Sequence, residues 1–428
     1  MPKQCDGKVS IMKYTFEYGR GEMSFDLDES RVNEVLHQNQ IDWKLLSPEE
    51  ELKRALRSPI GTERLEKIIK PGEKIAIITS DISRPLPGHV VLPVLVDELY
   101  AAGAKKEDIT IVFALGSHRG HTEEEKEYLV GSRLYREIRC IDTDPDDCLR
   151  AGITSNGTVV DIFSEVMKAD RRICVGNIEY HYFVGYSGGI KAIMPGVSTK
   201  EAIRLNHSHM VEAGAKAGNI NSPVRKDIEE VSGLCSVDFI LNVVLDEDKN
   251  VIRAVAGHHE TAHREGCDYL DRVYKKPIKE RADIVIVTPG GFPKDQNMYQ
   301  AQKALDNAKE AVRDGGIIIW AAACTEGLGS ELFEKWMRDY EPDFMIEEIK
   351  RDFKLGAHKA AAIAMVLKRA DIFLISELED DFVKNMGFIP FASIDQAIAE
   401  ANLRLGSDSS VIIMPHGGST LPIEEFSR

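Results

Sequence analysis

Short apolar segments, each followed by polar or glycine-rich residues, constrain the fold of this 428-residue chain most strongly. In the first half of the chain they lie at residues 74–80, 108–115 and 172–178. Continuous apolar strands are typical of parallel sheets that are covered on both faces. A helix is expected at about residues 90–102, where it ends before Gly103. This alternation predicts βαβ units.

Other segments add antiparallel strands and a capped helix. Residues 11–28 alternate apolar and polar side chains around a glycine turn, which predicts a β-hairpin. Apolar strands near 237–245 and 250–255 predict a second hairpin. Residues 48–58 predict a helix that Ser47 caps. A mixed sheet is therefore expected in the first half of the chain.

A second α/β region begins at residue 282, after a charged connector at about 258–280 that is expected to be helical. Its length of about 150 residues is typical of a separate domain. The sequence therefore predicts two α/β domains with mixed and parallel sheets, at residues 1–272 and 273–428. Further strands and helices of the second domain are expected at 282–288, 317–323, 330–368 (helices), 371–376 and 411–415.

Composition limits the class of partner. A net charge of −16 and a pI near 5.3 argue against a nucleic-acid groove or an anionic membrane surface. The seven cysteines are scattered and form no C-x-x-C pair, which is typical of reduced thiols. No signal peptide or membrane-spanning segment is apparent. We expect a soluble, cytoplasmic protein, and a homo-oligomer is left open.

Residues 181–209 combine glycines with potential catalytic groups. His181 follows an expected strand, and Gly188 and Gly189 precede Lys191. Glycine allows a close backbone approach or a positive φ. A lysine in such a loop can bind phosphate or act as a nucleophile, but it can equally be an ordinary surface residue. His207 lies sixteen residues further along the chain.

Polar side chains follow three successive strands. Asp81 and Arg84 follow the first strand, His118 follows the second, and His181 follows the third. Because the carboxyl ends of parallel strands meet at one edge, these groups are expected to converge. Five other histidines are expected to be structural or surface residues: His121, His209, His258, His259 and His263.

In the second domain, a helix is expected to begin near Asn297. Tyr299 and Lys303 are then i,i+4 neighbours, and Gln300 and Lys303 are i,i+3 neighbours. A phenol, an amide and an ammonium group at one helix end can hold a small carboxylate. An ordinary polar helix start is the alternative.

The residues alone leave two alternatives open. One is a zinc-dependent hydrolase or lyase that uses His118 and His181 as ligands, although no H-E-x-x-H helix is present. The phosphate-binding fingerprints of dinucleotide and P-loop proteins are absent. A non-catalytic nucleotide- or metal-binding protein is the other alternative.

Five motifs together resemble the nickel-pincer lactate racemase family, over roughly residues 70–310. Their order and spacing carry the resemblance, since no single motif is decisive. They are Asp81-x-x-Arg84, Gly116-Ser117-His118, the segment from His181 to Lys191, Asn206-His207 and Tyr299-Gln300-x-x-Lys303.

The resemblance implies a cofactor, a nickel-pincer nucleotide, which is a pyridinium-3,5-bisthiocarboxylic acid mononucleotide with Ni²⁺. Lys191 would be joined to it covalently, and His207 would be the fourth nickel ligand. Sulfur donors with one imidazole suit nickel(II). Asp81 and Arg84 would hold the nucleotide, with Arg84 near the reacting centre, and Gly188 and Gly189 would let the backbone lie against it. Residues 1–272 would then form the cofactor-binding domain, served by the enzymes that build the cofactor.

The implied reaction is racemisation or epimerisation at C2 of a 2-hydroxy acid by proton-coupled hydride transfer. Either enantiomer needs a base, and His118 and His181 would supply the two imidazoles. Tyr299, Gln300 and Lys303 of the C-terminal domain would bind the substrate, in an interdomain active-site cleft. One departure is His358, which lies in a region where the lactate enzyme has a tryptophan beside the substrate. This difference leaves larger or more polar 2-hydroxy acids open as substrates.

Overall fold

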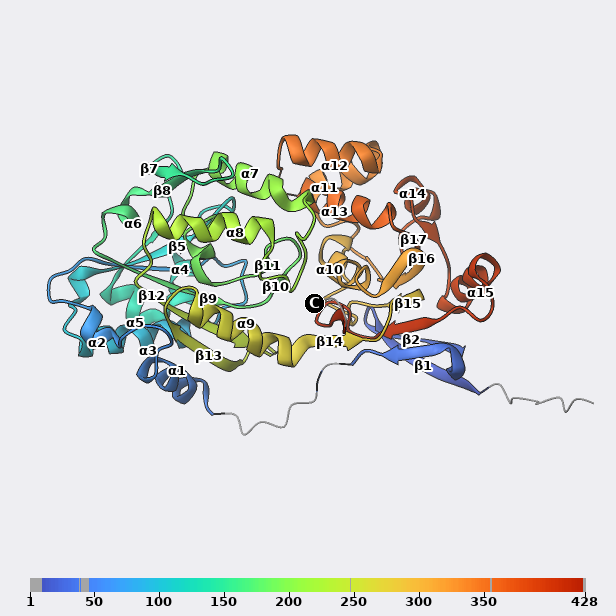
Figure 1. The fold of residues 1–428 in the computed structure, drawn as a ribbon, viewed down its shortest axis with the longest axis horizontal. Coiled ribbons are helices and arrows are strands. Elements are labelled where there is room, and N and C mark those ends of the chain that lie inside the picture. The colour runs from blue at the N-terminus through green and yellow to red at the C-terminus, as the bar shows by residue number, and fades with distance from the viewer. Residues whose placement is uncertain (1–9, 38, 40–45, 247, 355, 426–428) are drawn as a thin grey trace, which may run out of the picture. The chain divides into compact units, whose positions relative to one another are not determined.

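The computed structural model describes residues 10–37, 39, 46–246, 248–354 and 356–425, which form two compact units. Unit 2 contains residues 41–272, and unit 1 contains residues 273–428 together with residues 1–40. The chain can be followed from blue through yellow to red in Figure 1. The expected N-terminal domain of residues 1–272 therefore differs from unit 2 in its first forty residues. The physical reason is that a strand from this segment pairs with the C-terminal sheet.

Unit 2 is built around a six-stranded sheet with the order β13-β12-β9-β4-β5-β6. All neighbouring strands are parallel except β12 and β13, which form the expected hairpin. The strands of this sheet are β4 (Ile75–Ser80), β5 (Ile109–Ala114), β6 (Arg139–Asp142), β9 (Arg171–Asn177), β12 (Phe239–Leu245) and β13 (Val251–Gly257). The mixed sheet that the sequence predicted is confirmed.

Helices cover one face of this sheet with a continuous apolar core. Leu52, Leu95 and Leu134 come from three of these helices and are almost completely buried against Ile77 and Ile111 of the sheet. The helices are α1 (Pro48–Arg57), α2 (Leu65–Ile68), α3 (Gly88–Ala101), α4 (Glu123–Val130) and α5 (Ser132–Glu137).

Capping boxes define the starts of two of these helices. Ser47 and Glu50 bond reciprocally at the start of α1, and Thr122 and Glu125 do the same at the start of α4. The sequence predicted the cap at Ser47.

The remaining elements of unit 2 include those that carry the glycine-rich segment. Helix α6 and the 3-10 helix η3 pack against β4. These elements are β7 (Cys148–Ile153), β8 (Val159–Phe163), α6 (Ser164–Lys168), β10 (Tyr180–His181), β11 (Gly185–Tyr186), η3 (Gly189–Ala192), α7 (Lys200–Ser208), α8 (Pro223–Glu230) and α9 (Thr261–Tyr274).

Unit 1 contains a second, all-parallel six-stranded sheet with the order β18-β17-β16-β15-β19-β3. Its strands are β3 (Val32–Val35), β15 (Ala282–Val287), β16 (Val312–Ala321), β17 (Ala370–Ile375), β18 (Ile389–Pro390) and β19 (Val411–Met414). Strand β3 closes one edge of the sheet, although it precedes β19 by most of the length of the chain.

Each face of the unit 1 sheet is covered. The N-terminal hairpin and α15 (Ile394–Leu405) pack on one face, where Phe16 and Phe25 join the apolar core. In Figure 1 this blue hairpin lies beside the red α15. Helices α10 (Met298–Ala308) and α13 (Ala357–Leu367) contact the sheet strands, and α11 (Glu331–Asp339) and α12 (Pro342–Arg351) pack on α13. The hairpin strands are β1 (Ile11–Tyr18) and β2 (Gly21–Asp28).

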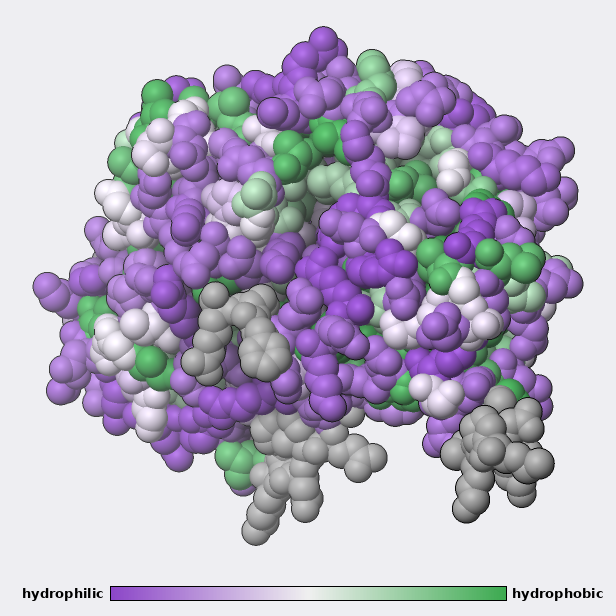
Figure 2. All heavy atoms as spheres, turned by 45° about the vertical axis from the view of Figure 1, so that its right-hand side comes forward, coloured by the Kyte–Doolittle hydropathy of each residue, from purple (hydrophilic) through white to green (hydrophobic). Residues whose placement is uncertain are grey.

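The visible surface is mostly hydrophilic (Figure 2). Figure 2 shows hydrophilic residues over most of the visible face, with hydrophobic residues in several smaller areas. No helix among the described residues is long and apolar enough to cross a bilayer.

Candidate functional site

The predicted catalytic residues of unit 2 follow strands at the centre of its sheet. The chain passes from β4 to β5 on one side, and later to β9 on the other side of β4. The order of the strands therefore reverses between β4 and β9, and ligands of open α/β sheets bind at the carboxyl ends of the strands at such a point. Asp81 directly follows β4, and His181 lies shortly after β9.

Asp81 and His118 form a hydrogen-bonded pair across the ends of β4 and β5. The Nδ1 atom of His118 lies 2.7 Å from Oδ2 of Asp81, and the Ser83 hydroxyl donates to Oδ1 at 2.9 Å. The Asp81 side chain is only 4% exposed, whereas that of His118 is 29% exposed. A buried carboxylate thus orients a more accessible imidazole.

The charge state of Asp81 follows from these contacts. Burial alone would raise the pKa of this carboxyl, but His118, the Ser83 hydroxyl and the charge of Arg84 together lower the pKa below its ordinary value. An ionised carboxylate only accepts hydrogen bonds, so Nδ1 of His118 carries a proton. In the neutral ring, Nε2 then has the lone pair that a general base needs. Both oxygens of Asp81 are thus engaged within the protein, although Asp81 was predicted as a nucleotide ligand.

His181 and His207 pack against the same aromatic ring. The ring centroid of Phe183 lies 4.5 Å from that of His181 and 5.0 Å from that of His207, and both contacts are edge-to-face. The backbone N–H of Val184 lies 3.4 Å from Nδ1 of His181. Residues predicted from two distant motifs therefore lie close together, and Phe183 is a positioning residue that the sequence analysis did not single out.

The loop with Lys191 packs over the same strand ends. Lys191 lies in η3, which contacts β4 and β9. The loop then reaches the end of β5, where the N–H of Gly116 donates to the carbonyl of Gly196 at 2.9 Å. Lys191 and the His118 loop thus belong to neighbouring parts of one sheet edge.

Gly188 and Gly189 are required by packing within the protein. Their φ values are +77° and +63°, a region that favours glycine. A Cβ atom on Gly188 would lie 2.9 Å from Oδ1 of Asn242, and one on Gly189 would lie 3.0 Å from the ring of His263. The N–H of Gly189 donates to Asn242 at 2.7 Å. These contacts explain both glycines without a ligand, while their predicted contact with the cofactor stays a prediction.

Two other predicted site residues, Arg84 and His207, differ in their exposure to solvent. Arg84 is exposed in the loop after β4, and His207 is buried at the end of α7. Among the described residues, no group of three or more His, Cys, Asp or Glu side chains is arranged to hold a metal ion.

His121 has a structural role, as the sequence analysis expected. Its Nδ1 lies 2.6 Å from Oδ1 of Asp142, and its Nε2 accepts the N–H of Ile82 at 3.0 Å. Since Ile82 follows Asp81, this buried imidazole fixes the loop that carries Asp81.

Two more of the histidines expected to be structural have partners within the protein. The Nε2 atom of buried His263 lies 2.7 Å from the carbonyl of Ser187, and desolvation lowers the pKa of His263 to about 3. The Nδ1 atom of His209 lies 2.5 Å from Glu212. These contacts support the structural interpretation of both residues.

In unit 1, α10 begins near Asn297 as predicted, and the side chain of Asn297 caps it by accepting the N–H of Gln300 at 3.0 Å. Gln300 and Lys303 are exposed on this helix, and Tyr299 is half-buried. The N–H groups of Met298 and Tyr299 donate to the carbonyls of Gly327 and Leu328, so these two N–H groups of the helix N-terminus are already satisfied within the protein.

Tyr299 is held by a lysine that the sequence analysis did not identify. The ammonium group of Lys359 donates to the carbonyl of Tyr299 and lies 3.9 Å from the centroid of its ring. Its neighbour His358 is buried, and Nδ1 of His358 accepts the N–H of Gly356 at 2.9 Å. Desolvation, followed by the charge of Lys359, lowers the pKa of His358 to about 3. His358 is thus a neutral residue within unit 1.

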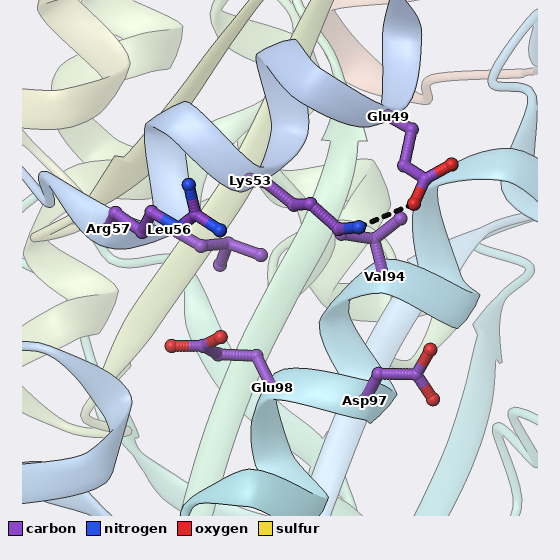
Figure 3. Close-up of a pocket in the computed structure, with 7 residues that line it drawn as sticks. All are labelled: Glu49, Lys53, Leu56, Arg57, Val94, Asp97 and Glu98. Atoms are coloured by element: carbon purple, nitrogen blue, oxygen red, sulfur yellow. Dashed lines mark hydrogen bonds and ion pairs between the residues drawn. The ribbon is translucent and has the colours of Figure 1, made fainter.

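A surface hollow of about 170 Å³ lies elsewhere in unit 2, between α1 and α3. Figure 3 shows the ion pair of Lys53 with Glu49 at its rim and the carboxylates of Asp97 and Glu98 on the facing helix. Asp97 and Glu98 also pair with arginines. The hollow is remote in sequence from the strand ends described above and contains none of the predicted site residues.

Comparisons with known proteins agree over nearly the whole chain. Residues 18–218 match the family model of the lactate racemase N-terminal domain, and residues 278–421 match that of the lactate racemase C-terminal domain. A lactate racemase of Thermoanaerobacterium thermosaccharolyticum is 32% identical over 95% of this chain and 98% of its own length. A lactate racemase of Lactiplantibacillus plantarum is 32% identical over 91% of this chain and 94% of its own length.

Solved structures give the same result for the fold. The lactate racemase apoprotein from T. thermosaccharolyticum superimposes with a TM-score of 0.87, covering 96% of this chain and all of that chain. A protein from Thermotoga maritima, 19% identical, superimposes with a TM-score of 0.62 over 90% of this chain and all of that chain and shares the fold.

Proposed function

Because this chain belongs to the lactate racemase family, we propose that it inverts C2 of a 2-hydroxy acid by reversible proton-coupled hydride transfer. The protein is an isomerase, a racemase, as its relatives are. Two observations support the proposal: Asp81 and His118 pair across the ends of β4 and β5, and His181 and His207 pack on the same ring, that of Phe183.

We propose that the cofactor is a nickel-pincer nucleotide, with Lys191 as the site of covalent attachment and His207 as the nickel ligand. The residues present fit this group, because Lys191 offers an amine from a glycine-rich loop and His207 a buried imidazole. A single imidazole that completes a set of soft sulfur donors is a suitable ligand for nickel(II). When bound, the cofactor supplies a reversible hydride acceptor.

In this proposal the protein's own residues manage the proton of the substrate 2-hydroxyl group. Nε2 of His118 takes this proton from one enantiomer, and His181 does so from the other. Asp81 keeps Nδ1 of His118 protonated and stabilises the imidazolium that forms. General acid–base help of this kind is typically worth about 10²–10⁴-fold in rate.

Two sets of residues are proposed to take part in substrate binding. Arg84 is exposed beside the Asp81–His118 pair and supplies a positive charge near the reacting centre. Tyr299, Gln300 and Lys303 are proposed to bind the carboxylate and the 2-oxygen, and the exposure of Gln300 and Lys303 supports this role. Lys359, through Tyr299, is a positioning residue in this scheme.

Lactate is the first substrate to test, because both curated relatives carry the name lactate racemase. The sequence analysis took His358 as a reason to consider larger or more polar acids. His358 is buried and neutral, with its Nδ1 bonded within the loop before α13, so its contacts give no support to a role in substrate recognition.

The test uses protein co-expressed with enzymes that build the cofactor, with chiral separation of lactate and of larger 2-hydroxy acids after incubation. Racemisation is expected in the wild type, and we expect His118→Ala and His181→Ala each to abolish it while the nickel content is kept. Retention of cofactor without turnover of any acid would favour the non-catalytic alternative. Zinc without sulfur ligands would instead favour a hydrolase or lyase.

A further inference from the structure

Four buried side chains form a hydrogen-bonded chain that ends at His207. The hydroxyl of Thr154 lies 2.5 Å from Oδ1 of Asp227, and Nδ2 of Asn206 lies 2.7 Å from Oδ2 of the same carboxylate. Oδ1 of Asn206 lies 3.1 Å from Nδ1 of His207. Asn206 and Asp227 are completely or almost completely buried, so these contacts are shielded from water.

The direction of each hydrogen bond follows from the chemistry of the groups. Thr154 accepts the N–H of Thr158 at 3.2 Å, so its own hydroxyl proton is directed to Asp227. The carboxylate of Asp227 only accepts, and the nitrogen of the Asn206 amide must therefore face it. This fixes the amide orientation, with Oδ1 toward His207. Since an amide oxygen also only accepts, Nδ1 of His207 must be the protonated nitrogen.

We propose that Asp227 and Asn206 are positioning residues that hold His207 in the Nδ1–H tautomer, so that Nε2 carries the lone pair for a metal. The structure thus assigns a role to a carboxylate twenty residues beyond the metal ligand in sequence. Outer hydrogen-bond partners of this kind set the tautomer of metal-binding histidines and commonly change metal affinity by about 10–100-fold. The metal-directed part rests on the proposed function, whereas the tautomer does not.

The decisive measurement is the tautomer of His207 in the protein without cofactor, from ¹⁵N NMR of histidine-labelled protein. The His207 signals are assigned by their loss in His207→Gln. We expect the Nδ1–H form of His207 in the wild type. His263 is an internal reference of the opposite kind, because its Nε2 donates to the carbonyl of Ser187. A wild-type His207 with its proton on Nε2 would overturn the proposal, whatever metal the enzyme binds.

Variants separate positioning from packing. Asn206→Leu removes the acceptor at similar volume and is expected to shift the tautomer ratio of His207 about tenfold toward Nε2–H, the size of one buried hydrogen bond. Thr154→Val removes only the distal donor to Asp227 and is expected to give a smaller shift, and it serves if Asn206→Leu does not fold. An unchanged His263 signal reports an intact fold. An unchanged ratio in both variants would contradict the proposal.

Nickel retention provides the second readout. In cofactor-loaded protein, we expect Asn206→Leu to lose nickel to a chelator about 10–100-fold faster than the wild type. If the wild type contains no nickel, the proposed function fails while the tautomer assignment still stands. If nickel is present but the variant retains it as well as the wild type does, the positioning role toward the metal fails.

Discussion

The Nδ1 atom of His118 lies 2.7 Å from the buried carboxylate of Asp81, and this pair joins the ends of two adjacent strands. The contact makes Asp81 a partner of the proposed base, which differs from the role as nucleotide ligand that the resemblance implied. The two roles predict different consequences of changing this carboxylate.

We predict that Asp81→Asn lowers kcat by about 10²-fold or more, because the amide can direct either an oxygen or an N–H toward Nδ1 and no longer stabilises an imidazolium. Cofactor loading, measured by nickel content and intact mass, is expected to be preserved. Ser83→Ala removes a hydroxyl that donates to the other carboxylate oxygen and also lies 3.1 Å from Nδ1 of His118, but it keeps the carboxylate, so a smaller effect on kcat is expected. Loss of the cofactor in Asp81→Asn would instead support the role as nucleotide ligand.

Covalent attachment of the cofactor makes a prediction about mass. In protein co-expressed with the cofactor-building enzymes, Lys191→Ala is expected to eliminate the adduct seen by intact-mass spectrometry, because no other amine replaces the tethering group. Lys200→Ala is the control, since Lys200 is an exposed lysine in the same segment, at the start of α7. An adduct of unchanged mass in Lys191→Ala would remove this residue from the scheme.

Gly189 tests whether the loop with Lys191 depends on packing against His263. Gly189→Ala introduces a Cβ at 3.0 Å from the imidazole, and Gly72→Ala introduces one with no heavy atom within 4 Å, although both positions have positive φ. Backbone strain is expected to lower the free energy of unfolding of each variant by about 1 kcal/mol. In Gly189→Ala, but not in Gly72→Ala, overpacking is expected to lower the free energy of unfolding further, by about 1–3 kcal/mol.

Thermal and urea unfolding of the two variants measure this difference. Gly189→Ala is also expected to lower attachment of the cofactor at Lys191. Equal destabilisation by the two substitutions would show that the loop accommodates the added carbon.

The main strands and the helix cap at Ser47 could be predicted from local sequence. Segments buried on both faces, such as β4 and β5, have continuous apolar sequences that the sequence analysis identified. Strand β7 escaped prediction, because its residues are exposed or half-buried and have no apolar run. Strand β3 also escaped, since its pairing with β19 joins segments at opposite ends of the chain.

The same limit applies to the candidate site. The positions of the histidines after the expected strands predicted which of them would lie at one edge of the sheet, because the carboxyl ends of parallel strands share that edge. Partners such as Asp227 could not be found this way, because Asp227 lies on α8 and is linked to His207 through the side chain of Asn206. Phe183 lies within the motif from His181 to Lys191. Its contacts with the rings of both His181 and His207 could not be predicted, because they depend on how β10 and α7 pack.

His358 provides a prediction about stability and pH. In the folded protein burial lowers its pKa from 6.5 to about 3, so the folded state keeps the ring neutral where the unfolded chain binds a proton. Stability is therefore fully present above about pH 6.5 and falls as the pH decreases toward 3, by up to about 1.4 kcal/mol per pH unit from this residue. His358→Asn retains an acceptor for Gly356 but cannot be protonated.

Urea unfolding between pH 7 and pH 5 compares the two proteins. The variant is expected to lose less free energy of unfolding over this interval than the wild type, even if it is less stable at pH 7. His37→Asn makes the same exchange at an exposed position and supplies the reference slope. Parallel pH profiles for His358→Asn and the wild type would mean that His358 is accessible to protons in the native state, which its burial against Phe353 argues against.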